Sequence, residues 1–267
     1  MFRDLTLGQY YPVDSPIHRL DPRTKLLLTL IHIIALFSAR DFWAFAVSAG
    51  FLAVCIGLSK VPVGYMARGL KPILFLLGIS VFFNIFWTKG EVLWEIWDIA
   101  ITKEGLIQAV WMAARLVLLI FGTSLLTYTT SPTELTAGLE QGLHFLNRIK
   151  IPVHEIAMMM TIALRFLPIL TQETNKIKMA QMARGADFET GGLIRRAKAM
   201  VPILVPLFVS AFRRADDLAV AMESRCYHGG EGRTRMKQLI MTGEDYAALI
   251  VSLLFLAGVI ALRNFGG

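Results

Sequence analysis

Five strongly apolar runs divide the chain, and each predicts a helix that enters or crosses a lipid bilayer. They cover residues 26–39, 42–58, 72–87, 105–128 and 246–262. A hydrocarbon core of about 30 Å takes roughly 20 apolar residues per helix. The first run would span only about 21 Å at about 1.5 Å per residue. We therefore expect it to gain a turn from Pro22, or to form a tight hairpin with the second run across Arg40-Asp41.

Between the fourth and fifth runs, residues 129–245 alternate apolar and charged stretches, as helices lying at a membrane surface do. Three helices are predicted there, over about 131–146, 152–184 and 193–227. The first opens on Ser-Pro-Thr-Glu at 131–134, which is a capping box with proline at the first helical position. Gly185 is suited to end the second helix, and the glycine pairs at 191–192 and 229–230 bound the third.

The second and third of these helices would each be about 50 Å long. Each carries narrow apolar stripes at helical spacing, so we expect the two to cross and pack on one another. The stripe of the third helix consists of Phe212, Ala215, Ala219 and Met222. Prolines in both (Pro168, Pro202 and Pro206) are expected to bend them.

The composition supports an integral membrane protein. Of 267 residues, 55% are hydrophobic and 18% are charged, where soluble domains carry about 25% charged residues. The mean hydropathy is +0.56, which excludes a disordered chain and disfavours a soluble enzyme. The two cysteines, Cys55 and Cys226, cannot form a disulfide framework. The predicted fold is therefore all-α, with about five transmembrane helices and a module of three further helices.

The distribution of Lys and Arg predicts the orientation. Basic residues concentrate in 1–25, in 59–71 and in 129–245, which alone holds 15 of the 27. The positive-inside rule places these segments in the cytoplasm and residues 88–104 outside. Three parts follow: 1–128 with the first four spans, the cytoplasmic 129–245, and 246–267 with the last span. Asp21 and Pro22 are suited to begin the first helix, with Arg23 and Lys25 at anionic headgroups.

The two long helices are predicted to end alike. Each ends on a small residue, an arginine and another small residue: Ala183, Arg184 and Gly185 in one, and Ser224, Arg225 and Cys226 in the other. Arginine at a helix C-terminus complements the helix dipole, which is a sufficient structural explanation for either alone. Two such ends also suit docking into a partner, because the guanidinium fork fits a carboxylate.

The two helix ends and the N-terminal residues resemble those of a known family. The Ala-Arg-Gly end at 183–185 and its second copy around Arg225 are similar to the paired signatures of the T component of energy-coupling factor (ECF) transporters. The lead also resembles that family, with Gly-Gln-Tyr at 8–10 and Ser-Pro-Ile-His-Arg-Leu-Asp-Pro-Arg-Thr-Lys at 15–25. The resemblance covers essentially the whole chain. Its second copy departs from the pattern, since Ser-Arg-Cys replaces Ala-Arg-Gly.

The resemblance implies a coupling subunit of an importer in a prokaryotic cell membrane. Two cytoplasmic ABC-type ATPases would each bind one arginine-ended coupling helix, through residues 183–185 and 224–226. A small membrane protein, the S component, would capture a vitamin or metal ion and reorient as the helices move. ATP and Mg would be used by the ATPases, and this chain would bind no cofactor and catalyse nothing. The sequence does not indicate which cargo is transported.

Other interpretations have weaker support. No phosphate-binding loop is present, and the five histidines show no metal-ligand spacing. Arg115, within the fourth run, is a candidate for a transport path or for helix packing.

A membrane enzyme acting on a lipid-linked substrate would need an acidic cluster, and Asp216-Asp217 lies beside arginines. A channel would need polar residues lining several spans, and these spans contain few of them. The basic surface suits anionic lipid and acidic partners rather than nucleic acid.

Overall fold

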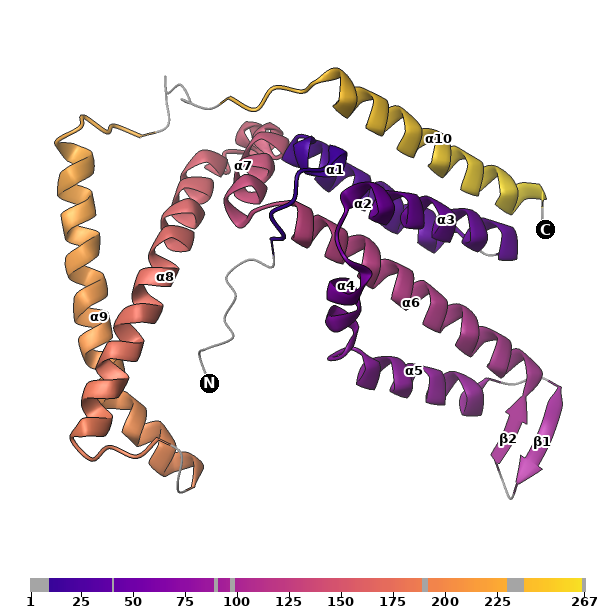
Figure 1. Cartoon of the computed structure of the whole chain (residues 1–267), viewed down its shortest axis with the longest axis horizontal. Helices are drawn as coiled ribbons and strands as arrows, with labels where there is room; N and C mark the ends of the chain where they lie inside the picture. Colours follow the sequence, from indigo (N-terminus) through magenta and orange to yellow (C-terminus); the bar gives the residue numbers. More distant parts are fainter. Residues whose placement is uncertain are drawn as a thin grey trace. The chain divides into compact units, whose positions relative to one another are not determined.

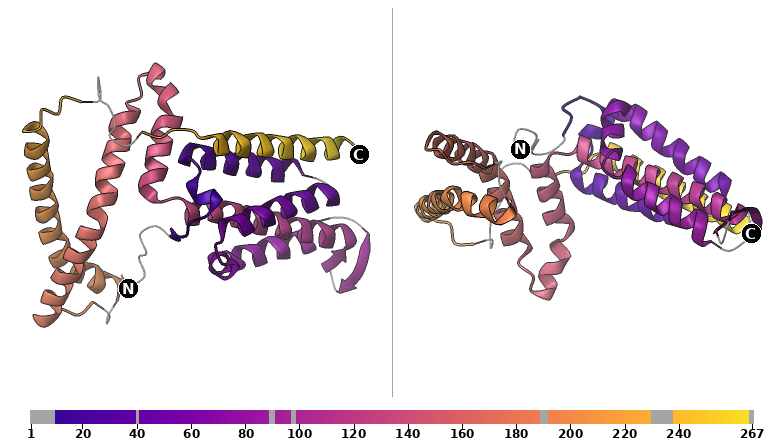
Figure 2. Two further views of the ribbon diagram at one scale, coloured as in Figure 1. Left: turned by 45° about the horizontal axis from the view of Figure 1, so that its top comes forward. Right: turned by 90° about the horizontal axis from the view of Figure 1, so that it is seen from below.

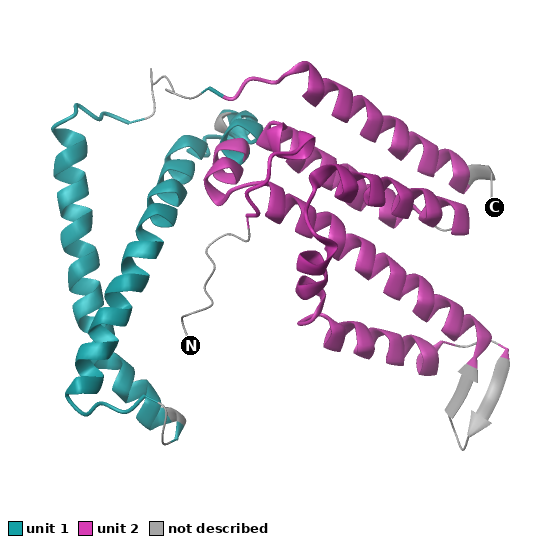
Figure 3. Ribbon diagram, viewed as in Figure 1, with its two compact units in different colours: residues 1–7, 139–238 teal, residues 8–138, 239–267 magenta. Residues whose placement is uncertain are grey.

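The computed structural model describes residues 10–39, 41–88, 91–96, 99–188, 192–229 and 238–265. The chain divides into two compact units, shown in Figure 3. We call residues 8–138 with 239–267 the bundle unit, and residues 139–238 the long-helix unit.

The bundle unit consists almost entirely of helices (Figure 1). The first five are α1 (Pro16–Arg19), α2 (Pro22–Ser38), α3 (Phe42–Ser59), α4 (Val63–Leu70) and α5 (Leu74–Trp87). A two-stranded antiparallel pair, β1 (Val92–Ile96) and β2 (Ile99–Thr102), precedes α6 (Lys103–Thr129). The unit is completed by the start of α7 (Pro132–Gly142) and by α10 (Gly243–Phe265).

Four helices are individually long and apolar enough to cross a membrane: α3, α6, α8 (Val153–Ala183) and α10. The pair α4 and α5 adds a fifth if it forms one broken span. Helix α2 has 17 residues, about 26 Å. The predicted class, an all-helical integral membrane protein with about five spans, is confirmed, and the short strand pair is an addition to it.

The predicted run over 72–87 corresponds to helix α5, which begins at Leu74, and a bend precedes it. Helices α4 and α5 meet at a bend of 62°, and Pro72 lies in the break, where its missing N–H interrupts helical hydrogen bonding. The first span begins at Pro22, as the short apolar run required. Asp21 caps it by accepting a hydrogen bond from the Arg23 N–H at 2.9 Å.

The core of the bundle unit is built from small residues on α2, α3 and α10. Ala35, Ala44 and Val259 have no exposed surface, and Phe51 stacks on Phe255 with ring centroids 4.2 Å apart. Small residues let helix backbones approach closely within a bilayer. The two views of Figure 2 show α10 (yellow) running beside the earliest helices.

One close approach requires a glycine. His32 of α2 is 5% exposed and packs over Gly122 of α6, where an added Cβ would lie 2.5 Å from His32 Cδ2. Phe255 lies beside the imidazole at a centroid distance of 6.4 Å. A larger residue at 122 would therefore force the imidazole or one of the two helix backbones to move.

We expect Gly122→Ala to lower the free energy of unfolding by about 2 kcal/mol, because the added Cβ would displace the buried imidazole or push the two helices apart. Thermal unfolding of the detergent-solubilised protein measures this. Gly50→Ala is the matched control, since nothing lies within 4 Å of its added Cβ. Adding His32→Ala to Gly122→Ala should restore part of the loss, and a double variant no better than additive would contradict the packing explanation.

A buried carboxylate joins the beginnings of α2 and α10. Asp245, 1% exposed, accepts hydrogen bonds from the Asp21 N–H at 2.7 Å and from the Thr242 N–H and hydroxyl, each at 2.8 Å. Arg23 adds a bond to the Leu239 carbonyl at 3.0 Å. Helix starts separated by 224 residues are thus held together at one end of the bundle.

The N-terminal residues that carry the family resemblance have a structural role in this unit. Ser15 caps α1, and His18 bonds the Ser15 hydroxyl at 2.6 Å and the Tyr11 carbonyl at 3.0 Å. Arg19 forms an exposed ion pair with Asp14 that holds the pKa of that carboxyl below its usual value. The sequence predicted Lys25 at anionic headgroups; in the structure its side chain is buried within this unit, 4% exposed.

The long-helix unit contains two helices of 31 residues each, α8 (Val153–Ala183) and α9 (Leu193–Glu223).

The capping box before α7 is confirmed: the Glu134 N–H donates to the Ser131 hydroxyl at 3.3 Å, and the Ser131 N–H to the Glu134 carboxylate at 3.2 Å. That helix is shorter than predicted, because α7 ends at Gly142 and the 3-10 helix η1 (His144–Ile149) follows.

Candidate functional site: two arginine-ended helices

Helix α8 ends in a hydrogen-bonded motif that places Arg184 at its tip. The Ala186 N–H donates to the Gln181 carbonyl and the Gly185 N–H to the Met182 carbonyl, both at 3.0 Å. Gly185 has a φ of +84°, in the left-handed region. These bonds define a Schellman motif. The helix therefore ends at Ala183 with Arg184 as its C-cap, one residue earlier than the predicted bound of 184.

Helix α9 ends in the same motif with different residues. The Tyr227 N–H donates to the Met222 carbonyl at 3.1 Å and the Cys226 N–H to the Glu223 carbonyl at 2.9 Å. Cys226 has a φ of +56° and thus occupies the position that Gly185 holds on α8. The helix therefore ends at Glu223, and is shorter than the predicted 193–227. The departure from Ala-Arg-Gly preserves the backbone geometry.

All six candidate residues lie on the surface. Ala183, Arg184 and Gly185 are exposed, and so are Ser224, Arg225 and Cys226. Among the described residues neither arginine has an ion-pair partner. Each tip thus presents a guanidinium fork between small side chains that leave it accessible to a carboxylate.

The left-handed position makes a testable difference between the two tips. A residue with a Cβ pays about 1 kcal/mol in this conformation relative to glycine. Cys226→Gly should therefore raise the free energy of opening of the last turn of α9 by about that amount, and Gly185→Ala should lower that of α8 by about as much. Hydrogen exchange of the last helical turns measures both changes. Opposite signs are expected, and equal exchange rates in wild type and variants would contradict the strain argument.

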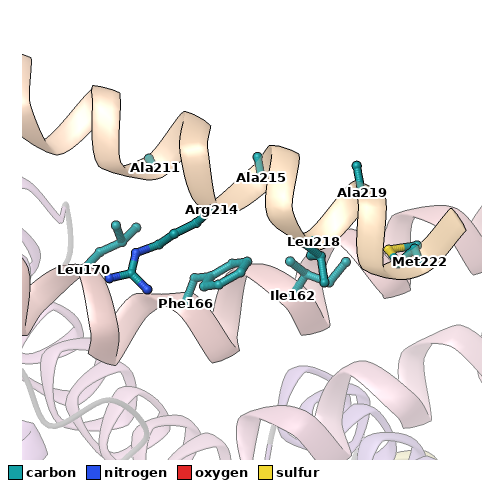
Figure 4. Close-up of a pocket in the computed structure, with 9 residues that line it drawn as sticks. All are labelled: Ile162, Phe166, Leu170, Ala211, Arg214, Ala215, Leu218, Ala219 and Met222. Atoms are coloured by element: carbon teal, nitrogen blue, oxygen red, sulfur yellow. The ribbon is translucent and has the colours of Figure 1, made fainter. Parts of the chain in front are cut away.

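The two long helices cross in opposite directions (Figure 4). Along the crossing, Leu170 of α8 lies near Ala211 of α9, while Ile162 lies near Met222. Residue numbers therefore fall on one helix as they rise on the other. As a result, Arg184 and Arg225 lie on opposite sides of the crossing point.

The crossing is lined by side chains of both helices. Ile162, Phe166 and Leu170 of α8 surround a hollow of about 270 Å³ with Arg214 and Leu218 of α9, which extend toward α8 (Figure 4). Ala215 and Ala219 border the hollow but are exposed. Arg214 stands at one side of it, with its guanidinium 3.7 Å from the Glu173 carboxylate. Of the predicted α9 stripe, Ala215, Ala219 and Met222 lie at the crossing, whereas Phe212 is 68% exposed.

Arg115 has a packing role in the bundle unit. Its guanidinium donates to the Ala39 carbonyl at 2.8 Å, at the end of α2, and lies 5.3 Å from the ring centre of Phe45. A cation at the C-terminal end of a helix stabilises its unpaired carbonyls. Within the described part of the chain, no group of three acidic, histidine or cysteine side chains is placed to hold a metal ion.

The fold and the arginine tips define a multi-pass helical membrane protein with a pair of crossing helices that present arginine at opposite ends. Residues 14–236 match the family described as CbiQ, cobalt transport protein. A relative from Thermosediminibacter oceani, named energy-coupling factor transporter transmembrane protein EcfT, is 54% identical over 98% of each chain. A Bacillus subtilis protein of that name is 45% identical, over 97% of this chain and 98% of its own. This chain belongs to that family, the transmembrane T components of ECF transporters.

Proposed function

We propose that this chain is the coupling subunit of an ECF-type importer. It links ATP binding and hydrolysis by two ABC-type ATPases to reorientation of a substrate-binding S component. The observation that carries the proposal is the pair of matching, exposed arginine tips on opposite sides of one helix crossing. Two separated tips can engage two partner subunits, one each, through residues 183–185 and 224–226.

Helix length supports transmission of motion over distance. Each long helix spans about 46 Å at about 1.5 Å per residue, and both continue through their internal prolines. A displacement applied at a tip therefore moves the crossing and the apolar surface around it. Exposed Leu204, Phe208 and Phe212 on α9 belong to that surface, which suits contact with a membrane partner.

The proposal includes an orientation in the membrane and a separate role for each partner subunit. The positive-inside rule favours a cytoplasmic N-terminus and cytoplasmic coupling helices in a prokaryotic cell membrane. ATP and Mg would be bound by the ATPases, and cargo selection, whether a vitamin or a metal ion, would belong to the S component. The alternative of a lipid-linked enzyme has less support, because Asp216 and Asp217 are exposed on a face that also carries Arg213.

Affinity purification of the tagged chain from its native membrane, with partners identified by mass spectrometry, tests the proposal. We expect two ABC-type ATPase subunits and at least one small membrane protein to co-purify. The identity of that small protein would then indicate the cargo. A chain that purifies alone under conditions that preserve other membrane complexes would overturn the coupling role and favour the enzyme.

A further inference from the structure

A cavity of about 420 Å³ lies inside the bundle unit, among α1, α2, α3, α6 and α10. Its wall is almost entirely apolar, and its volume falls within the range of ligand sites, about 300–1,000 Å³. Two residues of the wall, Val54 and Leu58 on α3, are 61% and 50% exposed. In a membrane these side chains face acyl chains, so the cavity adjoins the bilayer.

The depth of the cavity corresponds to one leaflet. The wall residues farthest along their helices from the end that holds Lys25 are His32, Phe51, Gly122 and Val251. Each lies seven to ten residues from the end of its helix, roughly 11–15 Å at about 1.5 Å per residue. Those four helix ends lie at the same end of the bundle. Half of a hydrocarbon core is about 15 Å, so a chain entering from that surface would reach the bilayer centre.

The shallow end of the cavity holds a buried cation. Lys25, 4% exposed, donates hydrogen bonds to the carbonyls of His18 and Thr129, both at 2.9 Å. Its ammonium carries three hydrogens, and among the described residues no carboxylate lies within ion-pair distance. The carboxylates of Glu134, Asp245 and Asp21 attract this buried charge only from farther away, so they leave room for a direct anionic partner. The acidic residue of this wall, Glu244, is exposed and is therefore screened by solvent.

We propose that the cavity binds one acyl chain of an anionic amphiphile, with the anionic group at Lys25 and the chain extending past Leu28 toward His32. Lys25 supplies the charge, the apolar wall supplies the fit, and the exposed side of α3 supplies the entrance. A free fatty acid and an anionic phospholipid share this chemistry. The inference depends on the membrane location of the bundle unit and not on the coupling role.

Photo-crosslinking of the purified full-length chain in lipid nanodiscs tests it. The probes are phosphatidylglycerol and phosphatidylcholine that carry a diazirine near the end of one acyl chain, and diazirine-bearing palmitate. We expect phosphatidylglycerol or palmitate to label half-buried cavity residues, such as Phe51, Leu125 and Ala248, above the outward residues Leu253 and Leu254. Competition by unlabelled palmitate distinguishes the free acid from the phospholipid.

Two variants sharpen the result. Ala248→Phe fills the cavity and should lower labelling of its wall about tenfold, whereas Leu254→Phe, on a side chain that is 67% exposed, should leave labelling unchanged. Lys25→Met should remove the preference for phosphatidylglycerol over phosphatidylcholine. Equal labelling of cavity and outward residues in the wild-type chain would overturn the proposal, because it would indicate surrounding bilayer lipid only, and this outcome needs no variant to fold.

Discussion

Charge reversal at both helix tips, Arg184→Glu with Arg225→Glu, is expected to abolish uptake and to lower the affinity for the ATPases at least about 100-fold. Both guanidinium groups are exposed and unpaired within the described chain, so the proposed carboxylate partners would meet a like charge instead. Uptake of labelled cargo by cells and co-purification of the ATPases measure the two effects.

The backbone of each tip is held by main-chain hydrogen bonds, so the substitutions should leave folding and membrane insertion intact. Each single variant should retain one ATPase subunit, because the tips lie on opposite sides of the crossing. Arg195→Glu with Arg196→Glu is the matched control, since it reverses two exposed charges at the start of α9. Wild-type uptake by the tip double variant would exclude the coupling role.

Removing the Asp245 carboxylate should be the most destabilising change in the bundle unit. Asp245→Ala leaves the Asp21 N–H and the two Thr242 donors without their acceptor. Hydrogen bonds to charged groups contribute about 1.5–3 kcal/mol each, so we expect a loss of at least about 3 kcal/mol in the free energy of unfolding. Thermal unfolding followed by tryptophan fluorescence measures the change.

Two further variants test the cause of that loss. Asp245→Asn keeps one acceptor and turns an amide donor toward the other N–H, so its stability should fall between those of Ala and wild type. The neighbouring Glu244→Ala should change the free energy of unfolding by less than about 0.5 kcal/mol, because Glu244 is exposed. Equal effects at 244 and 245 would show that the joined helix starts add no stability.

Local signals in the sequence were sufficient for most of the helices. The capping box at 131–134, Pro22 after Asp21, and Gly185 after the long helix each depend on interactions within a few residues. The antiparallel course of α8 and α9 and the role of Arg115 depend instead on partners far along the chain. The Ala39 carbonyl, 76 residues from Arg115, leaves no trace in the local pattern.

Three features of the structure left no clear signal in the sequence. Lys25 follows an arginine and a threonine at the start of an apolar helix, a pattern typical of the membrane surface, yet the ends of α1 and α6 enclose it. The bend between α4 and α5 was not predicted, because the apolar run begins at Pro72 and no helix was predicted for the residues before it. At the tips, nothing in the residue types Ser, Arg and Cys indicated the left-handed backbone of Cys226.

The crossing of α8 and α9 also makes two levers of unequal length. From Phe166 to Arg184 the arm is about 27 Å, whereas from Ala215 to Arg225 it is about 15 Å, at about 1.5 Å per residue. Equal strokes applied at the two tips would therefore turn the shorter arm through roughly twice the angle of the longer one. Two identical motors acting on this chain would produce an asymmetric tilt at the fulcrum, with its larger rotation in α9.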